Sequence, residues 1–531
     1  MTLKTTSRTL MAALAAALAV AAATVAGATP PLASTDNGPV RGLRTGQVAA
    51  YLGLPYAAPP VGPLRWRPPA PSASWTGARD AASFQPACPQ KGVSMPGEPP
   101  PSTAEDCLYL NVWTPIRRPT RPRPVMVWIH GGGYAKGATA LPLYWGDRLA
   151  GRGVVVVSLN YRLGPLGFLA HPELSREGGG TSGNYGLMDQ IAALEWVQRN
   201  IAAFGGDPDN VTLFGQSAGA MSISLLTASP RARGLFHRAI AQSGAVFEPL
   251  ELAPGYRLPQ AEKDGVTYAA SLGADSLAAL RALPADRLLE GRASLVTHPV
   301  IEPTVLPLSP YEAFVAGRQN KTPVLLGYNA EEARSLVNLT AVRADTFQAD
   351  LTRAWGGLPP TITAAYPFVT DAESRQARAD LERDLRFGWD MWAWARLQDK
   401  AGGPPAYAYR FSRRPPFPAT SERGGWGASH FAELWYMFDH LDQEPWAWSR
   451  TDRRLADLMS RYWINFARSG NPNGPGLPVW PAYTTGSDLF LDLGDEVAPR
   501  VNPDQKTLRA FDQTYDAVRG APFGTAPGPR P

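Results

Sequence analysis

The chain has 531 residues, 44% of them hydrophobic, and a formal net charge of +5 at pH 7. Such a length can bury a large core, and a net charge this small and scattered argues against nucleic acid as a partner. No low-complexity linker divides the chain, and no phosphate loop or metal-ligand spacing is present, so we expect neither a cofactor nor a metal.

The N-terminal sequence predicts a signal peptide. A basic start precedes an alanine-rich apolar run over 10–25 and an A-x-A cleavage site at 26–28. We therefore expect removal of residues 1–28, a mature domain over 29–531, and a secreted or periplasmic protein free of the membrane. The alternative is an uncleaved anchor, but a run dominated by alanine is weakly apolar.

The chain contains only two cysteines, Cys88 and Cys107. An even number of cysteines in a secreted chain favours a disulfide, here closing a proline-rich loop. Neither side chain is a credible nucleophile or metal ligand.

Strands and helices alternate between residues 125 and 244. The pattern predicts strands at 125–129, 154–161, 211–214 and 239–242, with a helix over 189–200. This order is typical of an α/β fold with a mostly parallel, doubly wound central sheet.

The first of these strands ends in His130-Gly131-Gly132-Gly133-Tyr134. Consecutive glycines allow backbone N–H groups to turn toward a developing oxyanion. We expect Gly132 and Gly133 to act there with Ala218, the residue that follows the predicted nucleophile.

The strand at 211–214 runs into Gly215-Gln216-Ser217-Ala218-Gly219 and then into a helix-compatible segment. This strand, turn and helix predict a nucleophile elbow, in which small flanking residues permit a strained serine. Ser217 is therefore the candidate nucleophile.

A serine nucleophile requires an acid and a base, and in this fold they follow the serine in that order. The apolar strand at 323–329 is followed by Glu331 and Glu332, between which the local pattern does not choose. Of the six histidines, order and spacing leave His430 and His440, and the glycine-rich loop before His430 favours it.

Residues 254–394 are predicted to be helices inserted over the carboxyl edge of the sheet, forming the wall or lid of a gorge. The aromatic cluster Phe387, Trp389, Trp392 and Trp394 indicates helix packing rather than a ligand site. The composition of 521–531 predicts a disordered tail.

Several separated blocks now resemble the type-B carboxylesterases, the α/β-hydrolases that include para-nitrobenzyl esterases, cholinesterases and neuroligins. Besides the elbow, the blocks are Leu52-Gly53-Leu54-Pro55-Tyr56, Glu105-Asp106-Cys107-Leu108, Asn160-Tyr161-Arg162, Gly183-Asn184-Tyr185-Gly186, Phe204-Gly205-Gly206-Asp207-Pro208 and Gly470-Asn471-Pro472-Asn473. One departure is Glu302-Pro303, where the family carries Asp-Gly.

The resemblance implies hydrolysis of small carboxylic esters through an acyl enzyme by a monomer. The family's G-x-N-x-x-E pattern places the acid on Glu332, and its H-x-x-E-L pattern places the base on His430. It also implies a bridge at the two cysteines and two structural ion pairs, Arg65 with Glu105 and Arg162 with Asp189.

Four residues beside these motifs, Tyr134, Gln216, Trp426 and Phe431, are expected to face the substrate pocket. A cholinesterase is disfavoured, because the cysteine loop lacks tryptophan and Gln216 replaces a glutamate. A neuroligin-like binding protein is disfavoured, because the serine, acid and histidine are all present. A specialised esterase for a bulky xenobiotic, mycotoxin or polyester is the remaining alternative.

Overall fold

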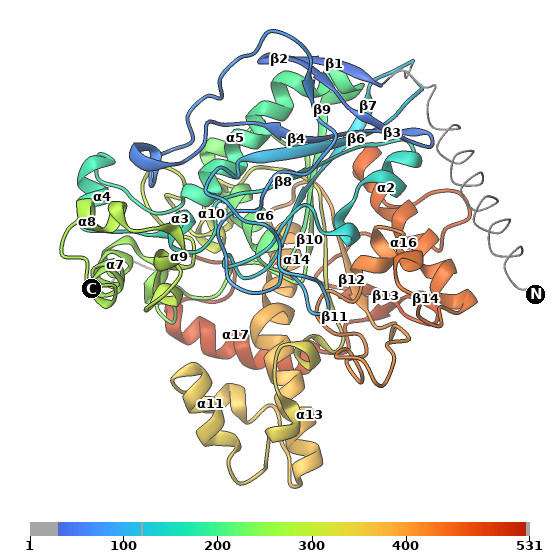
Figure 1. The fold of residues 1–531 in the computed structure, drawn as a ribbon. Helices are drawn as coiled ribbons and strands as arrows, with labels where there is room; N and C mark the ends of the chain where they lie inside the picture. The colour runs from blue at the N-terminus through green and yellow to red at the C-terminus, as the bar shows by residue number, and fades with distance from the viewer. Residues whose placement is uncertain (1–29, 118–119, 527–531) are drawn as a thin grey trace, which may run out of the picture.

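The computed structural model describes residues 30–117 and 120–526, which build an 11-stranded central sheet (Figure 1). Its strands, in spatial order, are β14 (Val497–Val501), β13 (Leu489–Leu493), β12 (Ala406–Phe411), β11 (Val324–Asn329), β10 (Arg238–Gln242), β9 (Gly206–Gln216), β7 (Arg123–Ile129), β8 (Val155–Leu159), β6 (Tyr109–Pro115), β4 (Val48–Pro55) and β3 (Leu43–Thr45). A small second sheet contains β1 (Leu32–Thr35), β2 (Gly38–Arg41) and β5 (Arg79–Asp80).

The seven strands from β13 to β8 run parallel to one another, and antiparallel strands flank them on both sides. The predicted mostly parallel α/β sheet is therefore confirmed. Every residue of β8 and β11 is buried, as expected for strands covered by helices on both faces.

Helices cover both faces of the sheet. The longer ones are α5 (Tyr185–Asn200), α6 (Ala218–Ala228), α7 (Leu258–Ser271), α11 (Phe347–Trp355), α13 (Asp371–Arg383), α14 (Trp389–Lys400), α16 (Arg450–Ser469) and α17 (Gln505–Arg519). The shorter ones are α2 (Asp147–Gly151), α3 (Gly164–Phe168), α4 (Pro172–Glu177), α8 (Leu277–Ala282), α9 (Ala285–Leu288), α10 (Pro310–Val315), α12 (Pro360–Thr363) and α15 (Leu434–Met437).

Strand β7 shows how the two faces arise. Val125 and Val127 belong to a core that includes α5, α6 and α14, whereas Met126 and Trp128 belong to a second core that includes α2 and α16. Successive side chains of a strand point to opposite faces, so one apolar run supplies both cores.

The helices between residues 254 and 394 do not form one insertion, which corrects the prediction. β11 lies inside this range as part of the sheet, and α14 packs against β11 and β12. Among the described helices, α11 and α13 project from the rest of the fold (Figure 1). β11 is the strand that the sequence predicts at 323–329, and it separates the helices before it from those after it.

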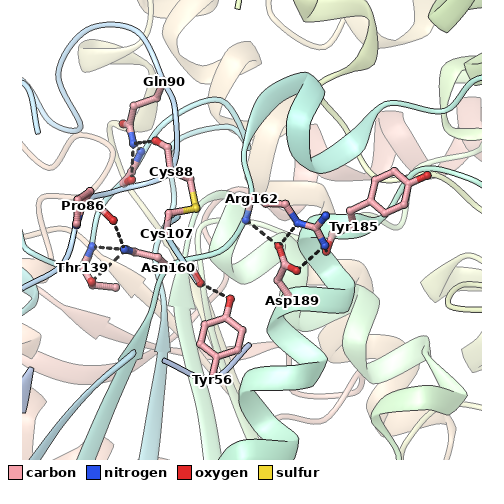
Figure 2. Close-up of a disulfide and its surroundings, with 11 residues drawn as sticks. Tyr56, Pro86, Cys88, Gln90, Cys107, Thr139, Asn160, Arg162, Tyr185 and Asp189 are labelled. Carbon is pink, nitrogen blue, oxygen red and sulfur yellow. Dashed lines mark hydrogen bonds and ion pairs between the residues drawn. A yellow bond between two sulfur atoms is a disulfide. The ribbon is translucent and has the colours of Figure 1, made fainter. Parts of the chain in front are cut away.

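The predicted disulfide and both ion pairs are present. Cys88 and Cys107 are bonded to each other (Figure 2). Nearby, the guanidinium of Arg162 binds Asp189 through two nitrogens, at 2.7 and 2.8 Å. Arg65 Nε lies 2.8 Å from Glu105 Oε2.

The end of the described chain corrects the predicted tail. The Phe523 ring packs against Tyr311 and Trp389, and Tyr311 Oη accepts a hydrogen bond from Gly524 N at 2.6 Å. Residues 521–526 are therefore ordered, because an aromatic side chain anchors them.

The predicted signal peptide, 1–28, and the last five residues, 527–531, lie outside the described residues. Within the described ranges, no helix combines the length and the apolarity needed to cross a bilayer.

Candidate active site

Ser217 occupies a sharp turn between β9 and α6. Its backbone angles, φ 57° and ψ −127°, are strained for a residue with a side chain. The glycines on either side permit this turn: a Cβ on Gly215 would lie 2.8 Å from Ile129 O, and a Cβ on Gly219 only 2.0 Å from the same atom. The structure thus forms the elbow that the sequence predicts.

The glycine loop after β7 lies beside this turn. Gly132 has a φ of +110°, and a Cβ there would lie 2.0 Å from Lys136 O. Among the contacts of the described residues, the N–H groups of Gly132 and Gly133 have no hydrogen-bond acceptor. They are available to an oxyanion in the cavity that both residues line.

His130 shapes the start of this loop and is not a base for the serine. Its ring stacks on Tyr161 at 4.5 Å, and its Nδ1 lies 2.9 Å from Gly131 O. Burial lowers the pKa of His130 to about 4, so its imidazole is neutral at pH 7.

The structure brings His430 and Glu332 together. His430 Nδ1 lies 2.6 Å from Glu332 Oε2, and both side chains are buried. Glu331 instead binds Arg414 and accepts a hydrogen bond from Ala428 N. His440 contacts a different carboxylate, because its Nε2 lies 3.2 Å from Asp147 Oδ1.

Ser217 and His430 line the same cavity, but Ser217 Oγ makes no hydrogen bond within the described part of the chain. Gln216 Nε2 lies 3.1 Å from His430 Nε2 instead. If the Nδ1 proton points to Glu332, Nε2 is an acceptor and the Gln216 amide donates to it. An unliganded site often has such a loose serine–histidine geometry.

Glu433 is a second buried carboxyl group, close enough to His430 and Glu332 to feel their charges. It accepts hydrogen bonds from Gln242 Nε2 at 3.0 Å and Asn329 Nδ2 at 2.6 Å. Burial, together with the charge of Glu332, raises the pKa of Glu433 to about 7. The sequence pattern gave no indication of this shift.

The cavity above Ser217 has a volume of about 710 Å³. This volume is in the range of small-molecule sites. Gln216 and Phe431, which were predicted to face the pocket, line the cavity.

The same prediction is wrong for Tyr134 and Trp426, which are not among the lining residues. Tyr134 is buried against Phe168, and Trp426 packs against Phe417 and Phe431. Both rings are adjacent in sequence to active-site motifs but turn into neighbouring cores.

The prediction that the aromatic cluster only packs helices together is wrong for Phe387. Its ring lies parallel to that of His430, with centroids 4.6 Å apart, and it lines the cavity. The residue belongs to a π-helical turn, Asp384–Gly388, that joins α13 to α14. The apolar pattern predicts a helix here but not the extra residue of a π turn, which redirects side chains and is frequent at functional sites.

The other members of the aromatic cluster behave as predicted. Trp394 is buried in the core, and the indole N–H groups of Trp389 and Trp392 donate to Asp512 and Asp488. Their packing is structural.

Three comparisons agree with this fold. The family model described as "Carboxylesterase family" matches residues 29–511. The chain is 38% identical to a fumonisin B1 esterase of Sphingopyxis macrogoltabida, over 87% of this chain and 86% of that protein. It is 36% identical to a para-nitrobenzyl esterase of Bacillus subtilis (strain 168), over 90% and 97% of the two chains.

A solved structure of a PNB esterase superposes with a TM-score of 0.78 at 34% identity, covering 91% of this chain and 100% of that one. The sheet and its elbow therefore define an α/β-hydrolase. This chain belongs to the carboxylesterase family and is a carboxylic ester hydrolase.

Proposed function

We propose that this protein is a secreted serine carboxylesterase that cleaves small carboxylic esters through an acyl-enzyme intermediate. Ser217 is the nucleophile, His430 the general base and Glu332 the orienting acid. The observation that carries the proposal is the 2.6 Å contact between His430 Nδ1 and Glu332 Oε2, together with the cavity that both His430 and Ser217 line.

In the first half of the reaction, His430 takes the Ser217 proton as Oγ attacks the ester carbonyl. Glu332 holds the imidazole and stabilises its charged form. The N–H groups of Gly132, Gly133 and Ala218 receive the oxyanion. His430 then protonates the leaving alcohol, and a water molecule activated by the same ring releases the acid.

Gln216 has to release His430 Nε2 before this sequence begins, because its amide lies where the Ser217 hydroxyl would donate. The Gln216 side chain lines the cavity, so a bound substrate can displace it by filling that space.

A second candidate function is a specialised esterase for bulky esters. Two observations favour it: the cavity volume of about 710 Å³, and the 38% identity to a protein named for its action on fumonisin B1. A pocket of this size accommodates drug-sized molecules.

The remaining parts of the proposal concern the whole chain. We place the catalytic domain over 29–531, after a signal peptide removed near Ala28, and the protein as a monomer outside the cell or in the periplasm. The basic start, apolar run and A-x-A site support the leader.

The test is Ser217→Ala assayed with 4-nitrophenyl butyrate. We expect kcat to fall on the order of a million-fold, as in serine hydrolases generally, with an unchanged circular dichroism spectrum. A serine-directed phosphonate should label Ser217 in the parent protein, and Ser222→Ala, one turn along α6, should still be labelled. Activity of Ser217→Ala within about tenfold of the parent would exclude the assignment.

A further inference from the structure

A buried hydrogen-bonded bridge connects the three segments that carry the proposed triad. Its members are Gln242, the last residue of β10, and Asn329, the last residue of β11. They meet at Glu433, which follows His430 by three residues. All three side chains are buried, and none of them lines the substrate cavity. The bridge therefore does not touch a substrate and can act on catalysis only through the residues it holds.

The Glu433 carboxylate joins two neighbouring strands. β10 and β11 lie side by side and parallel, so Gln242 and Asn329 end at the same edge of the sheet. Gln242 Nε2 donates to one carboxylate oxygen at 3.0 Å, and Asn329 Nδ2 donates to the other at 2.6 Å. Because one carboxylate accepts from both strands, the loop that precedes α15 is fixed against both strand ends.

Gln242 also holds the turn of the proposed nucleophile. Its main-chain oxygen accepts a hydrogen bond from Ser217 N at 2.9 Å. Its side-chain oxygen accepts another from Trp463 Nε1, also at 2.9 Å. An indole N–H group can only donate, so Trp463 fixes the orientation of the amide and directs Nε2 to Glu433. A single residue thus links the Ser217 turn to the carboxylate.

Asn329 holds the acid and the base. Its main-chain N–H donates to Glu332 Oε1 at 2.7 Å. Its side-chain Nδ2 donates a second hydrogen bond to Ser429 O at 2.8 Å, and Ser429 directly precedes His430. The Asn329 amide therefore sets the position of the histidine loop relative to the acid.

The second amide atom of Asn329 indicates that stability alone does not account for this residue. Asn329 Oδ1 is fully buried and makes no hydrogen bond within the described ranges. A buried carbonyl oxygen without a donor destabilises the folded state. The amide carries this cost, so its value to the protein lies in the two contacts of Nδ2.

We propose that Gln242 and Asn329 are positioning residues, which clamp Glu433 and with it the loop that carries His430. The clamp ties this loop and the nucleophile turn to the same two strand ends. Once Gln216 has released the imidazole, Ser217 and His430 can then meet without a movement of the main chain. This inference rests on the proposed esterase function, because the clamp matters only if His430 accepts the Ser217 proton.

Removal of the amides tests the clamp. Gln242→Met and Asn329→Leu keep most of the side-chain volume and remove the hydrogen bonds. We expect each variant to lower kcat for 4-nitrophenyl butyrate by roughly tenfold to a hundredfold, because small misplacements of a catalytic group cost that much. KM should change by less than about threefold, since no contact to the substrate is lost. An unchanged kcat in either folded variant, or a loss confined to KM, would overturn the proposal.

Two buried amides elsewhere in the fold are matched controls. Asn320 Nδ2 and Gln398 Nε2 each donate to two main-chain oxygens, and neither residue lines the cavity. Asn320→Leu and Gln398→Met should lower stability but change kcat by less than about threefold. A loss of kcat as large as in the clamp variants would show that any buried amide has this effect, and would overturn the proposal.

An exchange of two side chains separates the hydrogen bonds from the charge of Glu433. Gln242→Glu and Glu433→Gln should each lower kcat, because the first brings two carboxyl groups together and the second turns an N–H group toward another. The double variant restores every contact: the amide at position 433 donates to the carboxylate at 242 and accepts from Asn329. We expect its kcat to return to within about threefold of the parent value. A double variant no more active than the weaker single variant would overturn the clamp.

Asn329→Ser covers the case in which the other variants do not fold, since a hydroxyl group donates only one hydrogen bond. Its kcat should fall by about threefold to thirtyfold, and a value equal to that of the parent would overturn the proposal. Failure of the parent protein to hydrolyse 4-nitrophenyl butyrate would instead refute the esterase function itself, so the two failures are distinguishable.

Discussion

The Phe387 ring lies against the His430 imidazole, with an interplanar angle of 13° and centroids 4.6 Å apart. Glu332 holds one edge of the imidazole through Nδ1, and Phe387 covers its face. A hydrogen bond at one atom leaves a ring free to rotate about that bond, and a stacked neighbour removes this freedom. Phe387 is thus a positioning residue for the proposed base.

We expect Phe387→Ala to lower kcat for 4-nitrophenyl butyrate by roughly tenfold to a hundredfold, because small misplacements of a catalytic group cost that much. KM should change less than kcat, and Phe387→Tyr should restore most of the activity. Phe417→Ala is the control, since Phe417 packs against Trp426, Trp435 and Trp446 outside the cavity. A loss confined to KM would indicate that Phe387 only lines the pocket.

The two adjacent glutamates should differ sharply. Glu332→Gln removes the charged partner of His430, so we expect kcat to fall by roughly ten-thousandfold, as for a triad acid. Glu331→Gln keeps an oxygen that can accept a hydrogen bond from Ala428 N. Its kcat should therefore stay within about tenfold of the parent value. Steady-state kinetics on both variants decides, and equal losses would contradict the assignment of the acid.

The ion pair of Arg162 with Asp189 provides a stability prediction. Its side chains are 4% and 0% exposed, so Asp189→Ala leaves a buried, unpaired guanidinium. We expect the free energy of unfolding in urea to fall by about 3–5 kcal/mol. The matched control is Asp80→Ala, because the side chains of the Arg41–Asp80 pair are 45% and 75% exposed. Loss of this pair should lower the free energy of unfolding by no more than about 1 kcal/mol.

Glu433 should make stability depend on pH. Its pKa in the folded protein is about 7, above the ordinary 4.5, so the folded state binds more protons between these values and stability falls as pH rises through them. In Glu433→Gln, the decrease between about pH 5 and pH 8 should be smaller by up to about 3 kcal/mol. The free energy of unfolding in urea is measured at both pH values for the parent and the variant. The same pH dependence in both proteins would contradict the prediction.

A charged substitution at Gln216 should change the pH profile of catalysis. Its amide lies 3.1 Å from His430 Nε2, so Gln216→Glu places a carboxylate beside the ring and stabilises the imidazolium. The acid limb of kcat/KM should therefore move to higher pH by about one unit. Gln216→Met, of similar size and uncharged, is the control. A shift to lower pH, or an equal shift in both variants, would refute this electrostatic explanation.

The sequence by itself determined the parts of the site that are continuous in the chain. The elbow around Ser217 and the glycine loop are local conformations. A Cβ on Gly132, Gly215 or Gly219 would lie within 3 Å of the backbone, and Gly133 has a φ of +62°, which favours glycine. The parallel sheet followed from the alternation of apolar strands and helices, because a strand covered on both faces needs an uninterrupted apolar run. Family motifs supplied the register that separates Glu332 from Glu331, which the local pattern left open.

Tertiary structure alone decided the walls of the cavity. Phe387 and His430 come from separate segments, and their meeting depends on a π turn and on how α14 packs against β11 and β12. For the same reason Tyr134 and Trp426, although adjacent to motifs, turned away from the pocket. Neighbours in sequence fix backbone conformation, but the direction in which a side chain points is set by packing between elements, which a linear pattern does not encode.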